Sequence, residues 1–293
     1  MNQNVNSNTD WANFRWNSNN LLFALGKARN MQGRLIGKME TLGFEHREEA
    51  LLKTLTLDIL KSAEIEREIL NPEQLKLSIA KRLGIKISNE YISDTEVDNI
   101  VEIILDATQQ NDKPLNAQTL FKWHTALFPS AERGMNKIVV CDWRSEKTNY
   151  KEVVSIEPEG KIIHFTTPDP TKLNNEMNTF FDWFNSDNSL DPLLKAGIAH
   201  LWLLTVQPFD KGNGVIAHII SNMILSKADE CSQKYYSLSS QFCIKKNEYF
   251  NILEKTKKDG LDITEWLIWF LNCLIAAYNA AFIDNKNMMS NLM

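Results

Sequence analysis

The chain has 293 residues, of which 43% are hydrophobic and 24% are charged, a balance typical of a soluble globular protein whose core needs no disulfide or metal for stability. The net charge is −5 and the isoelectric point is about 5.7. Broad nucleic-acid binding depends on Lys and Arg side chains that neutralise phosphates, so the acidic balance argues against a nucleic-acid partner.

The cysteines and the N-terminus indicate a reducing compartment. No two of the four cysteines lie at the spacing of a zinc or redox site. The first residues, MNQNVNSNTDW, are polar and lack the apolar core of a secretory signal. We therefore expect a cytoplasmic protein with no metal site. The cysteines are Cys141, Cys231, Cys243 and Cys273.

The first third of the chain has a helical pattern. Apolar residues recur at helical spacing from Asn19 to Leu83, which predicts two or three helices. Another helix is expected from Asp94 to Gln109, and a further one after Asn116. The expected start and stop residues are Asn71-Pro72, Gly84, Asp94 and Asn116.

Three short β-branched stretches interrupt the helices. They are KIVVCDWR at 137–144, KEVVSI at 151–156 and KIIHF at 161–165. The last two are joined by residues 157–160, with proline second and glycine fourth, as a type I turn prefers. This pattern predicts a β-hairpin inside an otherwise helical protein.

Helical pattern then continues to the end of the chain. Asp191-Pro192 supplies an N-cap and a proline at the first helical position for the apolar helix that follows. A glycine loop separates this helix from another over about Val215–Ala228, and one or two more are expected over Lys245–Ile283.

The stretch from Trp266 to Ile283 carries no charge and reaches the lower length limit of a membrane span. However, Asn272 and Asn279 lie seven residues apart on one helical face, and acidic rather than basic residues precede the stretch. A buried packing helix is therefore favoured over a span, and we expect no membrane partner.

The loop itself reads TVQPFDKGNGVIAH over residues 205–218. Its glycines allow backbone N–H groups to turn toward one point, and the start of the next helix adds positive potential there, which together favour an anion site. A plain glycine turn between two core helices is the alternative. The groups predicted to face an anion or nucleotide are Phe209, Lys211, Gly212, Asn213, Gly214 and His218.

The loop and its flanks, AHLWLLTVQPFDKGNGVIAH, resemble the signature of the Fic family, His-Pro-Phe-x-acidic-Gly-Asn-Gly-Arg-x-x-Arg. Pro208, Phe209, Gly212, Asn213 and Gly214 match in register. The N-terminal part, WNSNNLLFALGKARNMQGRLIGKMETLGF, is similar to the helical region that precedes the Fic core in one bacterial subgroup, so the resemblance covers about residues 11–283.

The resemblance implies an all-α fold, a Fic-type helical bundle with a small β-hairpin flap and an N-terminal helical region. The expected boundaries are 1–92 for that region with its inhibitory helix, 93–285 for the Fic core and 286–293 for a tail. Longer relatives carry a DNA-binding segment after the core, and we expect none here.

The family implies transfer of AMP from ATP to a hydroxyl of a target protein. The loop histidine is then the general base, the acidic residue holds Mg²⁺ and the arginines hold phosphates. This chain has Gln207, Lys211, Val215 and His218 at these four positions. An amide cannot accept the proton, and an ammonium repels the metal, so we expect AMP transfer to be lost. ATP and Mg²⁺ would be cofactors only if the family activity survives.

The segment KSAEIEREIL at 61–70 resembles the inhibitory helix of the family, in which a glutamate one turn after a Ser or Thr pairs with the second loop arginine. Ser62 and Glu66 fit this pattern, and His218 becomes the expected partner of Glu66. Arg67 follows where the family prefers Gly or Asn. A solvated charged helix is the alternative.

The predicted hairpin resembles the flap that docks a target segment by main-chain pairing. Val153, Val154 and Ser155 would form this edge, and a hairpin that only covers the core is the alternative. Arg144 lies just before it and was assigned no definite role.

The interpretation is a Fic-fold protein with a degenerate loop that acts as a protein- or anion-binding regulatory module. An active adenylyltransferase and a purely structural or oligomeric role are the alternatives. The expected partner is an unknown target protein, and a homo-oligomer stays open.

Overall fold

A computed structural model describes residues 13–86, 94–109, 112–129, 138–145, 152–157, 160–186, 189–229, 234–258 and 261–290. Pro158 and Glu159 of the predicted turn, Lys137 of the first predicted strand and Cys231 lie outside the described residues.

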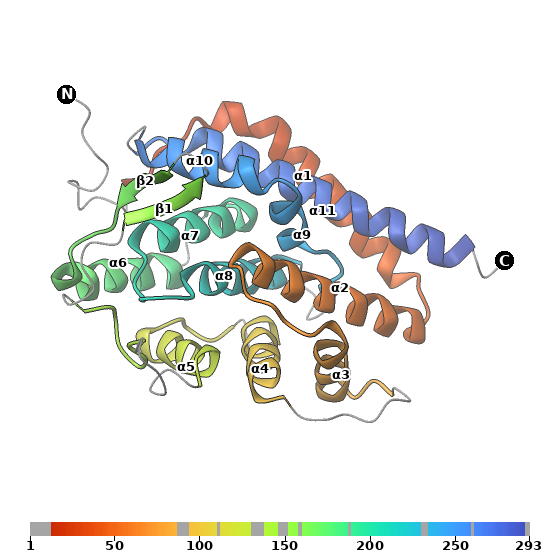
Figure 1. The fold of residues 1–293 in the computed structure, drawn as a ribbon. Helices are drawn as coiled ribbons and strands as arrows, with labels where there is room; N and C mark the ends of the chain where they lie inside the picture. The colour runs from red at the N-terminus through yellow and green to blue at the C-terminus, as the bar shows by residue number, and fades with distance from the viewer. Residues whose placement is uncertain are drawn as a thin grey trace.

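Helices dominate these ranges, and a single hairpin accompanies them (Figure 1). In chain order the elements are α1 (Ser18–Glu40), α2 (Phe44–Ile65), α3 (Pro72–Leu83), α4 (Thr95–Gln109), α5 (Ala117–Leu127), β1 (Glu152–Glu157), β2 (Gly160–Thr166), η3 (Pro170–Lys172), α6 (Leu173–Asn185), α7 (Pro192–Val206), α8 (Asn213–Ala228), α9 (Leu238–Ile244), α10 (Lys246–Lys258) and α11 (Thr264–Ser290). The predicted fold class, a helical bundle with a small hairpin, is confirmed.

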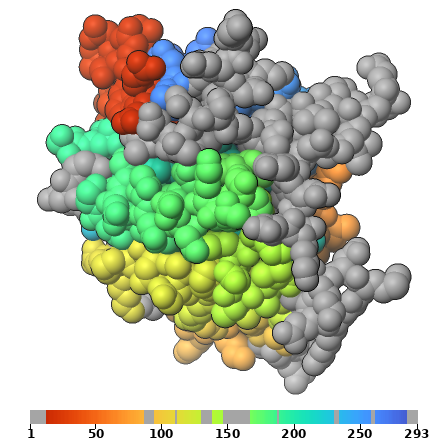
Figure 2. Space-filling view, turned by 90° about the vertical axis from the view of Figure 1, so that its left-hand side faces the viewer, coloured from red at the N-terminus to blue at the C-terminus, as the bar shows by residue number. Residues whose placement is uncertain are grey.

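The antiparallel helices α7 and α8 form the centre of the bundle and are joined by the glycine loop. Both are buried over almost their whole length. Helices α1 and α11 lie together along one side, and α3, α4 and α5 form the opposite side, as Figure 1 shows. In Figure 2 the green surface of α6 lies between the start of α1 and the yellow surface of α4 and α5. The arrangement places the loop between α2, α5 and α8.

Most predicted helix ends are confirmed by their capping bonds. Asn71 Oδ1 accepts hydrogen bonds from the backbone N–H groups of Glu73 and Gln74, at 3.0 and 3.1 Å. The side chains of Asn116 and Asp191 cap α5 and α7 in the same way. Gly84 ends α3 with a left-handed φ of 71°, a conformation that glycine adopts at little cost.

The first predicted strand is wrong. The described part of that stretch, residues 138–144, contains no strand. Its backbone is bonded to the glycine loop: the Val139 N–H donates to Asp210 Oδ2 and the Arg144 N–H to the Pro208 carbonyl. Cys141 has a φ of 63°, which breaks the extended conformation that its β-branched neighbours favour.

The predicted hairpin is confirmed, with β1 antiparallel to β2 and a register shift between Val153 and Val154. Two other details differ from the sequence pattern. Helix α8 starts at Asn213, two residues earlier than expected, and the helix α9 was missed because its seven residues are too few to show a helical period. The signal that would have found α9 is Ser237, whose hydroxyl accepts from the Ser240 N–H at 3.1 Å.

The uncharged C-terminal stretch forms most of α11. Residues 264–284 of this helix are long and apolar enough to cross a membrane by length and composition, and 56% of the apolar window is buried inside the protein. The helix packs against α1, α7 and α9. Gly197 of α7 lets it approach closely, because a Cβ at that position would press on the ring of Phe270. This packing agrees with the interpretation of a core helix.

Helix α2 ends in a strained turn. Glu66 is its C-cap, and Arg67 has a φ of 62°, in the left-handed region that favours glycine. The Glu68 N–H donates to the Ala63 carbonyl at 2.9 Å across this turn, as in a Schellman motif. The preference for Gly or Asn after the glutamate, noted from the sequence, therefore has a backbone cause.

The Arg67 conformation gives the first prediction. Arg67→Gly should raise the free energy of unfolding by about 1 kcal/mol, because glycine adopts the left-handed conformation without the Cβ clash and Arg67 is exposed. Gly84→Ala is the matched control at another left-handed helix end and should lower stability by a similar amount. Urea denaturation measures both, and a destabilised Arg67→Gly would contradict the assignment of strain.

Candidate functional site

The glycine loop is braced by its own side chains. Asn213 Oδ1 accepts from the Phe209 N–H at 2.9 Å, and Asn213 Nδ2 donates to the Phe209 carbonyl at 2.8 Å. Phe209 is fully buried, and the ring of His124 stacks on it with centroids 4.1 Å apart. His124 Nε2 also lies 3.0 Å from the Lys211 carbonyl. His124 of α5 thus fixes the loop.

Arg144 is the residue that sequence reasoning missed most clearly. Its side chain is buried, its Nε donates to the Gln207 carbonyl at 2.8 Å, and its Nη2 donates to the Pro168 carbonyl. Burial lowers its pKa, an effect that the charges of Asp210 and Asp169 oppose. Arg144 therefore holds the start of the loop by backbone contacts, which no sequence pattern signals.

Gln207 stands at the position of the family general base and caps the C-terminal end of α7. Its φ of 46° and ψ of 65° are left-handed, and its N–H donates to the Leu203 carbonyl at 2.8 Å. The conformation is unusual for a residue other than glycine and is retained because Arg144 donates a hydrogen bond to the carbonyl of Gln207 itself. Gln207 thus has the strained backbone conformation that is common at reactive residues, but its side chain is an amide whose nitrogen accepts no proton.

Lys211 lies outside the loop curve and pairs with Glu68, its Nζ 2.5 Å from Oε1. The ammonium also lies 5.6 Å from the ring centre of Phe128. Both partners of the ion pair are half-exposed, so the pair contributes about 1 kcal/mol or less. The nearest loop carboxylate, Asp210, accepts from the Val139 N–H at 3.2 Å.

Glu66 covers the N-terminus of α8. Its carboxylate lies so close to Gly214 that a Cβ on this glycine would overlap it. Burial and the charge of Glu68 raise the pKa of Glu66, whereas the charges of Lys246 and Lys211 lower it. The first turn of α8 has no acidic residue of its own, so the carboxylate from α2 takes the position that the helix dipole favours for an anion.

The expected pairing of Glu66 with His218 is wrong. His218 is buried and turns toward Ser239, whose hydroxyl lies 3.5 Å from its Nδ1, and toward the charges of Asp58 and Lys234. Burial lowers the pKa of His218 to about 4, which Asp58 opposes. His218 is therefore neutral near pH 6.

A buried ionic network holds α2 on α8. Asp58 Oδ2 accepts from Asn222 at 2.9 Å and lies 3.3 Å from the Lys234 Nζ. Burial would raise the pKa of Asp58, but Lys234 and hydrogen bonds from Ser237 and the Ser239 N–H outweigh it and lower the pKa. The network fixes the helix whose end carries Glu66.

A pocket of about 320 Å³ opens between the end of α2 and the loop. Glu66, Lys211 and Gly212 line its polar side, and Ser62 lies in its wall. Val215, at the position of the first family arginine, makes the opposite side apolar together with residues such as Ile100 and Phe128. Among the residues that the structure describes, no three His, Cys, Asp or Glu side chains gather to hold a metal ion.

His200 is a core histidine. Its Nδ1 lies 3.1 Å from the Ser221 hydroxyl and its Nε2 lies 2.9 Å from that of Tyr249. The flap residues Val153, Val154 and Ser155 lie on β1, which is described by its backbone and its pairing with β2.

Two antiparallel central helices are joined by a braced glycine loop, and a glutamate from a third helix covers this loop. This arrangement is that of a Fic-type helical protein. Residues 114–225 match the family described as Fic/DOC family, and residues 5–85 match a domain of unknown function, DUF4172. Residues 114–225 of the chain are thus similar to the Fic/DOC family.

Named relatives match over a short segment. The protein adenylyltransferase fic-1 of Caenorhabditis elegans is 35% identical over 69 residues, which is 23% of this chain and 14% of that protein. The protein adenylyltransferase Fic of Nematostella vectensis is 38% identical over 63 residues, 21% of this chain and 15% of that protein. The match thus spans about a seventh of the length of each of these two relatives.

Two solved structures share the fold. A Fic domain containing signaling protein from Bacteroides thetaiotaomicron has a TM-score of 0.63 at 20% identity and covers 89% of this chain and 97% of its own. A Fic family protein from Desulfovibrio desulfuricans has a TM-score of 0.64 at 16% identity, covering 91% of this chain and 75% of its own. At these identities the likeness concerns the fold.

The second prediction concerns His218. Because its pKa falls from 6.5 to about 4 on folding, the unfolded chain binds the proton more tightly, and stability is lost as the pH falls from above 6.5 toward 4. Between pH 7 and pH 5 this histidine accounts for a loss of about 2 kcal/mol. His218→Gln should remove that part of the loss in urea denaturation, while the contribution of buried His200 remains.

The matched control is His46→Gln, at the start of α2, which should keep the wild-type dependence on pH. An equal loss in wild type and His218→Gln would contradict a neutral buried His218.

Proposed function

We propose that the chain is a Fic-domain protein that does not transfer AMP and acts as a protein- or anion-binding regulatory module through its loop and hairpin. The observation that carries the proposal is the composition of the loop. Hydrogen bonds hold its backbone in place, but the positions of the family base, metal ligand and two arginines are occupied by Gln207, Lys211, Val215 and a neutral His218.

Each replacement removes one part of the reaction. Gln207 cannot accept a proton from a target hydroxyl, a step that contributes roughly 10²–10⁴-fold to the rate. Lys211 donates hydrogen bonds and ligates no cation, so Mg²⁺ does not fit its position. Val215 offers no phosphate donor. The loop therefore keeps its shape without the groups that position and activate ATP.

Glu66 supports a regulated anion site. Its carboxylate occupies the start of α8, where backbone N–H groups and the helix dipole attract an anion. A partner that draws the end of α2 away from Gly214 would open this position. Arg67, which follows immediately, has a strained backbone conformation, so the turn that must move is already energetically unfavourable.

The hairpin is the proposed docking element for a target protein. Strand β1, with Val153, Val154 and Ser155, belongs to a two-stranded sheet, and an added strand could pair with its main chain. A cytoplasmic location is part of the proposal and is supported by the three described cysteines, Cys141, Cys243 and Cys273, which form no disulfide.

One observation favours the alternative of an active nucleotidyltransferase. Asp210 Oδ1 is buried and has no hydrogen-bond partner among the described residues, so a carboxylate oxygen next to Lys211 is free for a cation. Its other oxygen is bound to the Val139 N–H, which directs the side chain toward the 138–145 segment rather than toward Gly212.

The third prediction is that neither wild type nor Glu66→Gly transfers AMP, because removing the glutamate opens the site without restoring a base. The measurement is incubation with ATP labelled at the α-phosphate, alone and with cell lysate. Magnesium-dependent labelling that disappears in Gly212→Glu, whose loop glycine has a φ of 82° and contacts Phe128, would show that the enzyme is active.

A restored variant calibrates this assay and gives the fourth prediction. Gln207→His, Lys211→Asp, Val215→Arg and His218→Arg, combined with Glu66→Gly, should restore self-modification, whereas single reversions should not, since residues that act as a unit are not additive. His218→Arg places a charge beside Lys234, so folding is checked by circular dichroism. A folded five-fold variant without labelling would mean that the pocket has diverged beyond the loop.

The fifth prediction concerns anion affinity. Sulfate, which keeps its charge across the pH range, should bind Glu66→Ala about tenfold more tightly than wild type, with Glu66→Gln between them because the amide keeps the shape but loses the charge. Mg²⁺ should not tighten binding. Isothermal titration measures these affinities, and equal binding in all three proteins would contradict a site covered by Glu66.

Acidity should act through the same residue. The pKa of Glu66 is raised, so as the pH falls through it the carboxylate becomes neutral and sulfate should bind wild type more tightly. The charges of Glu68, Lys211 and Lys246 also face this group. The increase should be absent in Glu66→Ala.

A further inference from the structure

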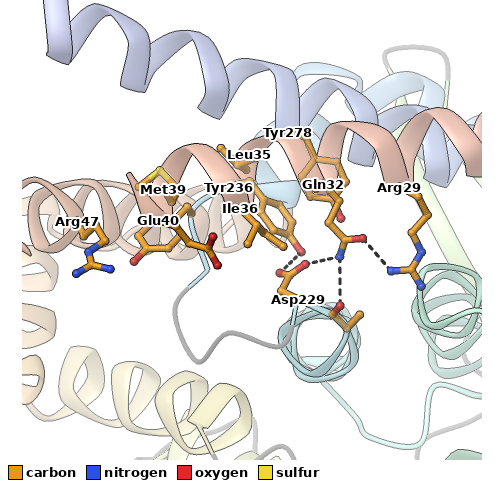
Figure 3. Close-up of a pocket in the computed structure, with 13 residues that line it drawn as sticks. Arg29, Gln32, Leu35, Ile36, Met39, Glu40, Arg47, Asp229, Tyr236 and Tyr278 are labelled. Atoms are coloured by element: carbon orange, nitrogen blue, oxygen red, sulfur yellow. Dashed lines mark hydrogen bonds between the residues drawn. The ribbon is translucent and has the colours of Figure 1, made fainter. Parts of the chain in front are cut away.

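A second concave site lies at the other end of α8 from the glycine loop. A groove of about 550 Å³ runs between α1, the start of α2, the C-terminal end of α8 and α11 (Figure 3). This volume lies within the range of small-molecule sites in proteins, about 300–1,000 Å³. The Fic loop contributes nothing to its lining.

The body of the groove is aliphatic and aromatic. Leu35, Ile36 and Met39 of α1 line one side. Tyr236 and Tyr278 line another, with ring centres 4.5 Å apart and planes at 67°. Such a lining favours an apolar or aromatic body on a ligand, because apolar surface is removed from water on both partners.

The polar groups in the depth of the groove are organised around Asp229. Its Oδ1 accepts from Gln32 at 2.5 Å and its Oδ2 accepts from the Tyr236 hydroxyl at 3.0 Å, as the dashed lines in Figure 3 show. The Tyr278 hydroxyl is buried beside that of Tyr236 and interacts with it. A hydroxyl both donates and accepts, so the pair of tyrosines can also bond a polar ligand atom in the groove.

Charged side chains stand at the two ends of the groove. Arg29 at one end forms an ion pair with Asp191 at 3.0 Å and a hydrogen bond to Gln32. Arg47 at the other end forms no ion pair within the described part of the chain (Figure 3). Glu40 lines the groove as well and weakens the field of Arg47. Arg47 is therefore the cation available to an acidic group on a ligand.

Gly33 keeps the groove open. It lies in the middle of α1, where glycine disfavours the helix, and a Cβ added there meets no atom within 4 Å. Gly26 and Gly37 of the same helix are equally free of neighbours but do not line the groove. A larger side chain at position 33 would project into the space between the helices.

We propose that this groove binds a small molecule with an aromatic or aliphatic body and one acidic group. The acidic group contacts Arg47, the body lies on Leu35 and Met39, and the Tyr278 hydroxyl bonds a polar atom of the ligand. This site is independent of the proposed function of the loop.

Two fluorescent dyes of nearly the same shape test the proposal on the full chain. 1-Anilinonaphthalene-8-sulfonate carries one acidic group, and N-phenyl-1-naphthylamine is its neutral counterpart. Saturable binding of both is expected, with the sulfonate bound more tightly. Gly33→Leu should weaken both by about tenfold or more while raising the melting temperature, because leucine favours the helix. Gly26→Leu, the matched control, should leave both affinities unchanged.

Charge variants test the acidic end of the site. Arg47→Gln should weaken the sulfonate about tenfold and leave the neutral dye unchanged, and Glu40→Gln should strengthen the sulfonate. Ile36→Trp fills the groove from the next turn and replaces Gly33→Leu if that variant is unfolded. Wild-type affinity in a folded groove-filling variant, absence of saturable binding, or an unchanged sulfonate affinity in Arg47→Gln would each overturn the proposal.

Discussion

The buried pair of Asp58 and Lys234 is the interaction on which the arrangement of the site depends. Both side chains are withdrawn from water, and Asn222 of α8 bonds to both of them. Removing one partner of such a pair leaves an uncompensated charge in the core, a loss of about 3–5 kcal/mol. Since Asp58 belongs to α2 and Asn222 to α8, the pair sets the position of one helix on the other.

The position of α2 determines what reaches the glycine loop. With α2 fixed two turns before its end, the carboxylate of Glu66 lies against Gly214, and only a glycine fits beneath it. The covering glutamate and the covered loop thus keep this geometry with Gln207 and Lys211 in the loop. This combination favours a role in which occupancy of the loop, rather than turnover, is controlled.

Helix α8 connects the two concave regions of the molecule. Gly212 and Val215 at its start line the pocket beside the loop, and Asp229 directly after its end lines the groove under α1. The helix has 16 residues, so about 24 Å separates the two regions. The N-terminal helices contribute to both regions: Glu66 of the α2 end lines the pocket beside the loop, and Gln32 of α1 lines the groove.

The sequence by itself determined the helices, their caps and the identity of the loop. Asn71, Asn116 and Asp191 act locally, because a capping bond spans two or three residues and needs no other part of the chain. The glycine motif is likewise local, and its spacing was enough to predict the family. The motif alone also placed Gln207 where the Fic signature has histidine.

Only the tertiary structure decided which side chains meet. The sequence pattern predicted a pair of Glu66 and His218. In the folded chain, however, the His218 side chain points toward a buried ionic network, and Glu66 lies against Gly214. A glycine has no side chain, so no sequence pattern signals this contact. Arg144 looked like part of a strand because β-branched residues precede it, but its partners are backbone carbonyls of the loop. Contacts between distant segments depend on packing and burial, which local residue patterns do not encode, and so the covered loop and the groove at Gly33 appear only in the folded chain.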